Sequence, residues 1–380
     1  MQFRDLKQQY AVLKTDIDRA VIEAVSSGAY IMGGPVLELE RQLAVYTRVR
    51  HCITCASGTD ALRLALKAWG VRQGDAVFVP DFTFFATAEA VSSEGATPVF
   101  VDVDCETFNI DPADLENKIE TTVQKGVLTP KVIIAVDLFG LPADYDAVRR
   151  IADNYGLLVL EDGAQGFGGC ANGKRSCSFG DISTTSFFPA KPLGCYGDGG
   201  ACFTDNDEWA ELMDSYRMHG KGSSKYENVR IGMNSRLDTI QASILKVKLK
   251  AFDAELAAVN QAAAHYNARL ADIVATPVVP AGFLSSRAQY TIRLNSKTER
   301  DALQSELRSQ GIPSMIYYPI PMHRQGAYRS LDTVVSQCPV ASKLCDTVLS
   351  LPIHPYITSE EIERVCDAMR NFMNRGIMSK

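Results

Sequence analysis

The chain has 380 residues, enough for about two and a half domains of ordinary size. Its 39 basic and 45 acidic residues give a net charge of −6, and 46% of the residues are hydrophobic. These values are typical of a soluble globular protein with a large core, and they speak against nucleic-acid binding. The sequence has no apolar run of 18 residues and is charged within its first four residues, so we expect no membrane span, no signal peptide and a cytoplasmic protein.

Ten cysteines are scattered along the sequence rather than framing a small domain. A chain of this length needs no disulfides, so we expect reduced thiols, most of them buried like small apolar side chains. Cys52 and Cys55 form a C-x-x-C beside His51, but no second pair of ligands completes a zinc set. We therefore predict no metal site.

The first 200 residues alternate short apolar runs with helical patterns. The runs predict strands over residues 51–55, 77–80, 97–102, 131–138 and 157–162. The helical patterns predict helices over residues 83–93, from Pro112 onward and over 144–155. Because these strands are continuously apolar, they indicate an α/β fold with a mostly parallel sheet that helices cover on both faces. Such sheets bind ligands beyond the carboxyl ends of their strands.

The second half of the chain begins with a long helical pattern over residues 235–270, which is one helix or two. It resembles a connection to a second domain. Beyond it we expect a strand over 289–294 and helices over 298–310 and 359–374. We therefore divide the chain into a large domain, residues 1–245, and a smaller α+β domain, residues 246–380.

Two local features beside predicted strands carry groups that could bind a ring cofactor with an anionic group. Gly58 and Thr59 begin an amphipathic helix, whose free N–H groups and hydroxyl suit a phosphate, although a simple helix cap explains them as well. Asp162 ends a buried strand, with Gln165 three residues further on. Its carboxylate could pair with a protonated ring nitrogen or form a turn.

Two further features carry a reactive amine and anion-binding side chains. Lys191 follows an apolar strand and stands between two prolines, where burial would lower its pKa and make it an amine suited to a Schiff base. The alternative is a lysine that reaches solvent from a strand end. Ser186 could add a hydroxyl to the same phosphate, while Asn234 and Arg236 precede the long helix and could reach an anion or serve as cap and surface charge. Together these features are what pyridoxal phosphate (PLP) requires.

The motifs resemble the fold type I sugar aminotransferases of the DegT/DnrJ/EryC1 family. The resemblance covers nearly the whole chain and is most specific in residues 186–200, SFFPAKPLGCYGDGG, and residues 234–238, NSRLD. It is closest to members that aminate C3 of a UDP-2-acetamido-3-keto-glucuronate with the amino group of L-glutamate. The resemblance implies a PLP-dependent homodimer that acts in surface polysaccharide biosynthesis.

The resemblance also implies roles for single residues. Lys191 would bind PLP covalently and Asp162 would pair with its ring nitrogen, and these two are the implied catalytic residues. The other implied cofactor contacts are Gly58, Thr59 and Ser186 at the phosphate, Gln165 at the ring hydroxyl side, Phe84 on the ring face and Asn234 at the phosphate of the partner subunit. The implied substrate contacts are Tyr30, Arg236, Tyr317 and His323.

Three positions depart from the usual family pattern. Gly163 replaces an alanine after Asp162, a change that we expect to be harmless. Tyr317 stands where the family has histidine in H-Y-P-x-P, and Gly34-Pro35 is shifted by one residue from the usual G-P-x-V. Both changes lie near the implied substrate and leave the sugar open. The alternatives are amination at C4, a dTDP-linked keto sugar, or a catalytically silent dimer, which the intact Lys191, Asp162 and Gln165 disfavour.

Overall fold

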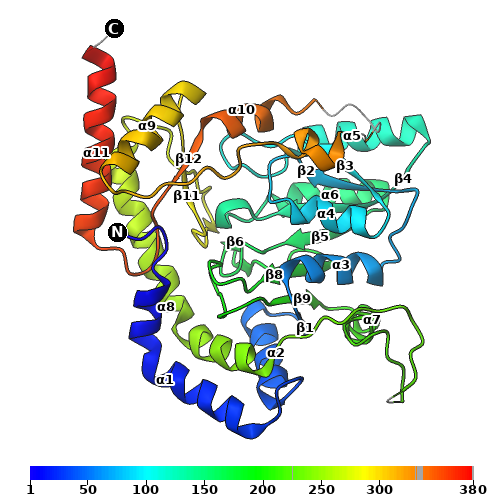
Figure 1. The fold of residues 1–380 in the computed structure, drawn as a ribbon. Helices are drawn as coiled ribbons and strands as arrows, with labels where there is room; N and C mark the ends of the chain where they lie inside the picture. The colour runs from blue at the N-terminus through cyan, green and yellow to red at the C-terminus, as the bar shows by residue number, and fades with distance from the viewer. Residues whose placement is uncertain (225, 330, 332–336, 379–380) are drawn as a thin grey trace.

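A seven-stranded sheet forms the centre of the protein in a computed structural model that describes residues 1–224, 226–329, 331 and 337–378 (Figure 1). The strand order is β1-β9-β8-β5-β4-β2-β3. The strands are β1 (His51–Cys55), β2 (Asp75–Pro80), β3 (Thr97–Val101), β4 (Thr129–Val136), β5 (Leu158–Asp162), β8 (Ile182–Ser186) and β9 (Gly200–Thr204). From β8 to β3 all neighbours are parallel, whereas β9 runs antiparallel to both β8 and β1. The predicted α/β fold with a mostly parallel sheet is confirmed.

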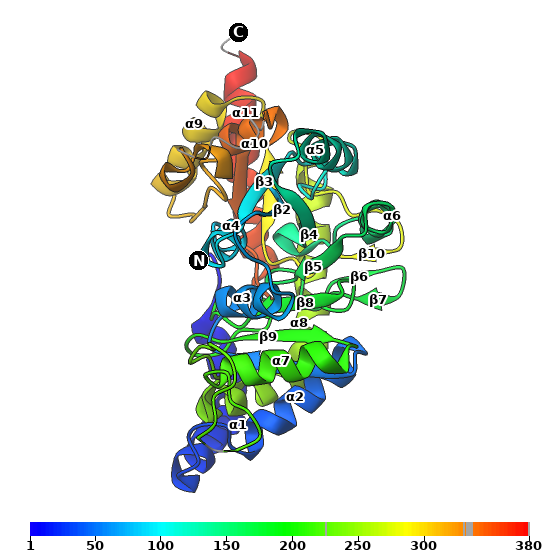
Figure 2. The ribbon, with the colours of Figure 1, turned by 90° about the vertical axis from the view of Figure 1, so that its right-hand side faces the viewer.

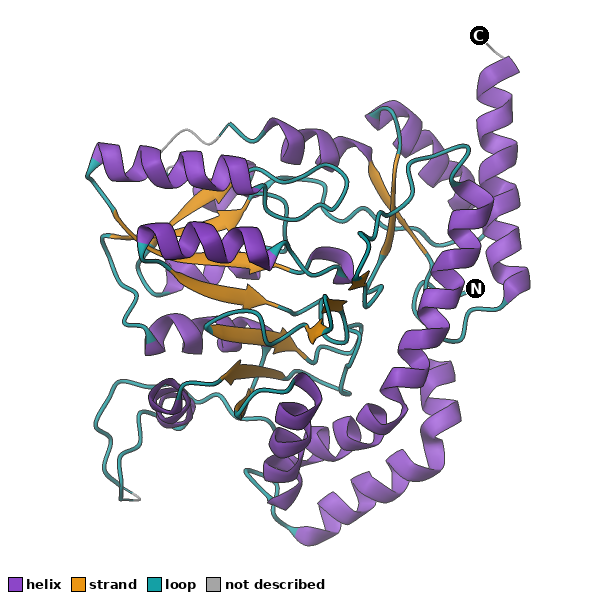
Figure 3. Cartoon of the chain, turned by 180° about the vertical axis from the view of Figure 1, so that it is seen from behind, coloured by secondary structure: helices purple, strands orange, loops and turns teal. Residues whose placement is uncertain are grey.

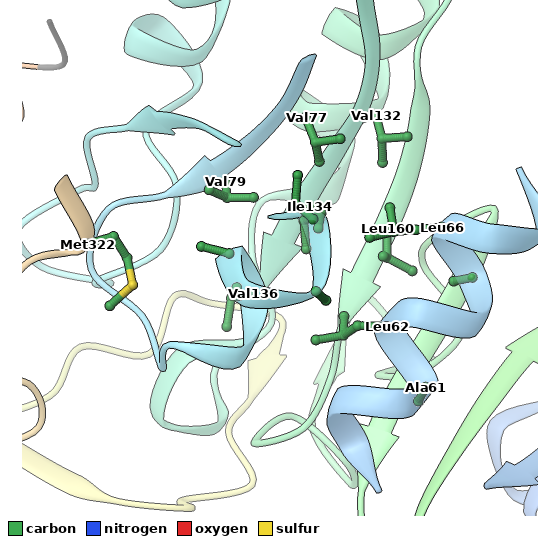
Figure 4. Packing of buried hydrophobic residues seen from close by; sticks show 14 of the residues in the cluster. Ala61, Leu62, Leu66, Val77, Val79, Val132, Ile134, Val136, Leu160 and Met322 are labelled. Carbon is green, nitrogen blue, oxygen red and sulfur yellow. The ribbon is translucent and has the colours of Figure 1, made fainter. Parts of the chain in front are cut away.

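Helices cover both faces of this sheet because alternate residues of each strand enter different hydrophobic clusters. Val77 and Val79 of β2 pack with helices α3 (Gly58–Ala68) and α4 (Ala86–Ser93). The residues of β2 that alternate with these valines pack with α5 (Pro112–Lys125) and α6 (Tyr145–Tyr155) on the opposite face. Figure 4 shows side chains of the first of these faces, from α3, from the valines and isoleucine of β2 and β4, and from Leu160 of β5. In Figure 2, α3 and α4 lie to the left of the strands and α6 to the right.

The second half of the chain forms a separate hydrophobic cluster beside the sheet. Its largest element is α8 (Thr239–Leu270), one continuous helix of 32 residues. The other elements that contribute to this cluster are β11 (Tyr290–Arg293), β12 (Val348–Leu351), α9 (Lys297–Ser309) and α11 (Ser359–Met378). The domain boundary that we predict after residue 245 falls inside α8, and the two-domain division is kept as a proposal.

The remaining elements connect these parts. They are α7 (Asp207–Arg217), α10 (Pro339–Thr347), the short strands β6 (Cys170–Ala171), β7 (Lys174–Arg175) and β10 (Phe283–Leu284), and three single-turn helices at Leu138–Gly140, Met322–Arg324 and Gly326–Tyr328. Within the described ranges, no helix combines the length and apolar character that crossing a bilayer requires. Eight of the ten cysteines are buried, all except Cys105 and Cys170, which confirms that most pack as apolar side chains.

The largest difference from the predicted elements lies at the start of the chain. Two helices, α1 (Leu6–Ser27) and α2 (Gly34–Thr47), precede β1, and the sequence patterns did not predict either of them. Helix α1 lies along α8, as seen from behind in Figure 3, and buries few residues in this chain: Gln9, Ile17 and Ala24. Because α1 has so few buried positions, its sequence shows no apolar stripe from which a helix could be predicted.

A second difference concerns the segment before α4. This helix begins at Ala86, and Thr83 to Phe85 belong to the loop that follows β2. The Thr83 and Thr87 hydroxyls lie 3.2 Å apart and form a hydrogen bond across the start of the helix. The predicted helix over 83–93 was therefore wrong at its first turn, which instead faces the candidate site.

Candidate active site

A pocket of about 460 Å³ lies at the carboxyl ends of the parallel strands. Strand β4 contributes Val136, the ends of β5 and β8 contribute Asp162 and Ser186, and α3 contributes its first turn. The pocket brings together eight of the residues singled out in the sequence: Gly58, Thr59, Phe84, Asp162, Gln165, Ser186, Lys191 and Tyr317. The parallel order of the strands explains this convergence, since their carboxyl ends share one edge of the sheet.

Lys191 lies in the loop after β8, where its backbone N–H donates to the carbonyl of Phe188 at 2.8 Å. Burial lowers the pKa of its amine, and the positive charge of Arg4 acts in the same direction, while the carboxylate of Asp162 opposes both. A lowered pKa increases the neutral, nucleophilic fraction of the amine at neutral pH. The environment therefore fits a lysine that attacks a carbonyl carbon.

Asp162 is 5% exposed at the end of β5. Its Oδ2 accepts a hydrogen bond from the Thr87 hydroxyl at 2.8 Å, and its Oδ1 accepts one from the N–H of Ala164 at 3.2 Å. Burial raises the pKa of this carboxyl, whereas the Thr87 hydrogen bond and the charge of Lys191 lower it. The two hydrogen bonds fix the direction of the carboxylate, as a partner for a ring nitrogen requires.

The first turn of α3 packs directly against Ser186. A Cβ added to Gly58 would lie 2.7 Å from the Cβ of Ser186, so only glycine permits this approach. Ser57 caps the helix, since its hydroxyl accepts from the N–H of Asp60 at 3.1 Å, and the N–H groups beside it have no partner within the helix. Together with the hydroxyls of Thr59 and Ser186, which also line the pocket, they form a cradle suited to a phosphate.

Gln289 also lines the pocket, and the part of the chain that the structure describes offers its buried Oε1 no hydrogen-bond partner. A buried acceptor without a partner is costly, which favours a bound group at this place. An anion cradle, a nucleophilic amine, a fixed carboxylate and this free acceptor fit PLP.

Gly58→Ala is expected to raise the dissociation constant of PLP by about tenfold or more, because a methyl group at that distance from Ser186 forces the cradle apart. The measurement is a fluorescence titration of the cofactor-free protein with PLP. Gly34→Ala is the matched control, since a Cβ there meets nothing within 4 Å. Equal affinities of the Gly58 variant and wild type would exclude this cradle.

Gln165 and Phe84 both line the pocket, and both lie close to Tyr318. Gln165 is 3% exposed, accepts from the N–H of Phe139 at 2.6 Å and donates to the hydroxyl of Tyr318 at 3.0 Å. The Phe84 ring is 54% exposed and lies 6.2 Å from the Tyr318 ring. Tyr318 thus connects both residues, and the sequence patterns did not single it out, although it follows Tyr317 directly.

Four predicted site residues do not line the pocket of this chain: Tyr30, Asn234, Arg236 and His323. Tyr30 is 50% exposed, and its carbonyl accepts from the N–H of Thr239 at the start of α8. Asn234 and Arg236 lie just before that helix, as predicted. The structure therefore places three of the four residues together near the N-terminus of α8.

His323 instead pairs with Asp81 in the loop after β2. Its ring Nδ1 lies 2.7 Å from one carboxylate oxygen of Asp81, and its backbone N–H donates to the other oxygen at 2.8 Å. Cys338 completes a cluster in which potential metal ligands lie within 4.8 Å of one another. His323 thus contacts both oxygens of Asp81, one through its ring and one through its backbone N–H.

A pair of buried carboxylates lies behind the pocket. Asp137 follows β4 and Glu161 belongs to β5, and both are fully buried. The Ser176 hydroxyl contacts both carboxylates, and the Tyr145 hydroxyl donates to Asp137 at 2.8 Å. Burial and the charge of Glu161 raise the pKa of Asp137 well above its ordinary value. Asp137 therefore holds its proton to a higher pH than a carboxyl group in water does.

This raised pKa predicts a pH-dependent stability. In the unfolded chain Asp137 titrates near pH 3.9. Its contribution to the folded state is fully present below that value and is lost as the pH rises through the higher pKa of the folded state. Between pH 3.9 and the higher pKa of the folded state, wild type is expected to lose about 1.4 kcal/mol of unfolding free energy per pH unit relative to Asp137→Asn. Urea unfolding at several pH values measures this slope, and Asp153→Asn on the exposed face of α6 is the control. Parallel curves for wild type and Asp137→Asn would contradict the prediction.

Comparisons with known proteins agree with this site. The model of the DegT/DnrJ/EryC1/StrS aminotransferase family matches residues 12–370. The chain is 43% identical to the UDP-2-acetamido-2-deoxy-3-oxo-D-glucuronate aminotransferase of Pseudomonas aeruginosa, over 98% of this chain and 100% of that one. It is 40% identical to the UDP-N-acetyl-3-dehydro-alpha-D-glucosamine 3-aminotransferase of Acidithiobacillus ferrooxidans, over 97% of both chains. A DegT DnrJ EryC1 StrS aminotransferase from Brucella abortus superposes with a TM-score of 0.96 at 46% identity, covering 98% of this chain and 99% of that one.

Proposed function

This chain belongs to the DegT/DnrJ/EryC1/StrS aminotransferase family and is a PLP-dependent enzyme, and we propose that it moves an amino group from L-glutamate to C3 of a UDP-linked 2-acetamido-3-keto hexuronate. The observation that carries the catalytic part is the convergence of Lys191, Asp162 and the Gly58 cradle in one pocket. Similarity to two UDP-sugar 3-aminotransferases over nearly the whole chain supports the choice of sugar.

The residues of the pocket divide the chemistry among them. Bound PLP supplies a ring that accepts electrons from the carbon that loses its proton. Lys191 would hold the cofactor through Nζ, and its amine would take and return the proton at the substrate carbon that carries the nitrogen. The carboxylate of Asp162 would hold a proton at the ring nitrogen. The first turn of α3 with Ser186 would bind the phosphate and fix the ring relative to both residues.

We also propose that the enzyme works as a homodimer in the cytoplasm and serves surface polysaccharide biosynthesis. Tyr30, Asn234 and Arg236 lie outside the pocket of their own chain, which accords with a role toward the pocket of a second copy. The loop before α8 also exposes the apolar side chains of Val229 and Ile231, which are 53% and 89% exposed. Exposed apolar residues of this kind favour a protein partner.

The test is amino transfer from L-glutamate to four keto sugars: a UDP-2-acetamido-3-keto-glucuronate, the corresponding 3-keto-glucosamine, a UDP-4-keto sugar and a dTDP-3-keto sugar. We expect the hexuronate to give the highest kcat/KM. Preference for the 4-keto or dTDP-linked sugar would overturn the proposed substrate and leave the aminotransferase activity intact. Absence of any half-reaction with L-glutamate, followed by the absorption of the cofactor, would overturn the proposed donor.

A further inference from the structure

The N-terminal segment before α1 lies against the wall of the active-site pocket. The carbonyl of Phe3 accepts a hydrogen bond from the N–H of Ile353 at 3.3 Å. The Phe3 ring meets the pocket residue Tyr317 edge-on, with ring centroids 6.2 Å apart. Figure 1 shows the N-terminus beside α8, on the left side of the molecule and about halfway up. The first residues are therefore held in place on both sides.

Arg4 extends from this segment to the loop that carries Lys191. Its Nη2 donates to the carbonyl oxygen of Lys191 at 3.0 Å, and its Nη1 lies 3.5 Å from the carbonyl oxygen of Ala288. Burial lowers the pKa of the Arg4 guanidinium to about 10, while the charge of Glu255 acts in the opposite direction. Within the described part of the chain, the hydrogen bonds of Arg4 thus go to main-chain carbonyl groups and not to a carboxylate.

Neighbouring contacts hold Arg4 at this position. Asp5 caps α1 by accepting from the N–H of Gln8 at 2.9 Å. One turn further along, Gln9 donates to both carboxylate oxygens of Glu255 on α8, at 2.9 and 3.1 Å. Helix α1 is thereby fixed to α8 close to the point where the chain enters the site.

Arg4 is one of two cations that hold the loop after β8. Lys248 of α8 donates to the carbonyl of Gly194 at 2.7 Å, three residues beyond Lys191. Its ammonium also lies 4.2 Å from the centre of the Tyr196 ring. Lys248 therefore fixes the far end of the loop, and Arg4 fixes its central residue.

We propose that Arg4 is a positioning residue for Lys191, which fixes the main chain of the lysine through its carbonyl group and keeps a second positive charge beside the amine. Arg4 is not among the residues that line the pocket, so it acts through Lys191 and not on the substrate. Because like charges repel, Arg4 lowers the pKa of the lysine together with burial. The N-terminal segment, 187 residues before Lys191 in the chain, thus tunes the reactive amine.

The test uses the holoenzyme and titrates the visible absorption band of the cofactor against pH, because this band follows the proton on Nζ of Lys191 where it holds the cofactor. Arg4→Met removes the charge, and we expect the midpoint of the titration to rise on the order of one pH unit. Arg4→Gln keeps a donor for the Lys191 carbonyl and loses the charge, so it gives the same shift in a variant closer to wild type. Arg4→Lys keeps the charge, and its midpoint stays near that of wild type.

Arg19→Met is the matched control, because Arg19 lies on α1 with 64% of its side chain exposed and pairs with Asp16. It changes the net charge by the same amount, and its midpoint is expected to equal that of wild type. Unchanged midpoints in both neutral Arg4 variants, or an equal shift in Arg19→Met, would overturn the inference. The inference rests on the proposed role of Lys191. If Lys191→Ala shows the same visible cofactor band as wild type, both the role of Lys191 and this inference are overturned. If only the titration midpoints of Arg4→Met and Arg4→Gln are unchanged, this inference alone is overturned.

Discussion

Replacement of Lys191 by alanine is expected to lower the turnover of amino transfer by about 10⁴-fold or more, because we propose that this residue supplies both the nucleophile and the general base. Among the described residues that line the pocket, Lys191 is the one that carries an amine. The variant is also expected to lose the absorption change that L-glutamate produces in the holoenzyme. Steady-state assays and absorption spectra measure the two effects separately.

Lys246→Ala provides the comparison for this prediction. Lys246 is a lysine of α8 that forms an ion pair with Glu38 near the surface and does not line the pocket. Its removal is expected to leave turnover within about twofold of wild type, since surface ion pairs contribute little. Turnover of Lys191→Ala comparable with that of Lys246→Ala would show that another residue carries the reaction.

The convergence of Asp162, Lys191 and Gly58 in one pocket was predictable from the sequence because these residues occur in local patterns at strand ends. Asp162 ends β5, Lys191 follows β8, and Gly58 begins the helix after β1. Each pattern is recognisable within about ten residues. The parallel order of the central strands then brings the patterns together, as a general property of open α/β sheets.

Residues that reach the site through tertiary packing left no such pattern. Arg4 and Lys191 are 187 residues apart in the chain, and Gln165 and Tyr318 are 153 residues apart. No periodicity or spacing connects positions at these distances. Arg4 in particular stands in a short charged segment whose sequence predicts solvent exposure. The packing of α1 against α8 and the contacts of Phe3 with Ile353 and Tyr317 bring it to the loop.

The predicted substrate residues show a different limit. Tyr317 lines the pocket of its own chain, whereas the other predicted substrate residues, Tyr30, Arg236 and His323, do not, and neither does the predicted cofactor contact Asn234. Local patterns identify residues that bind anions but do not say which copy of the chain they serve. A site that forms between two chains therefore needs the assembly as well as the fold, and the roles of these residues are proposals.

Asp162→Asn is expected to lower turnover by about 10²- to 10⁴-fold while the protein still binds PLP, because the amide cannot hold a proton at the ring nitrogen as a carboxylate does. The substitution preserves the size of the side chain. Its Oδ1 can keep the N–H of Ala164, while its NH₂ group faces the Thr87 hydroxyl, which can turn and accept instead of donating. We therefore expect the unfolding free energy to change by less than about 1 kcal/mol.

Thr87→Val separates the charge of Asp162 from its orientation. The substitution removes the 2.8 Å hydrogen bond to Oδ2 and keeps the carboxylate, so we expect less than about a tenfold loss of turnover. The Thr87 hydrogen bond also lowers the pKa of Asp162, so its loss raises that pKa and shifts the acidic limb of the kcat profile to higher pH. Asp162→Asn has no carboxyl at this position and loses that titration. If both variants lose turnover equally and keep the same acidic limb as wild type, the ring nitrogen does not depend on the charge of Asp162, and another group must protonate it.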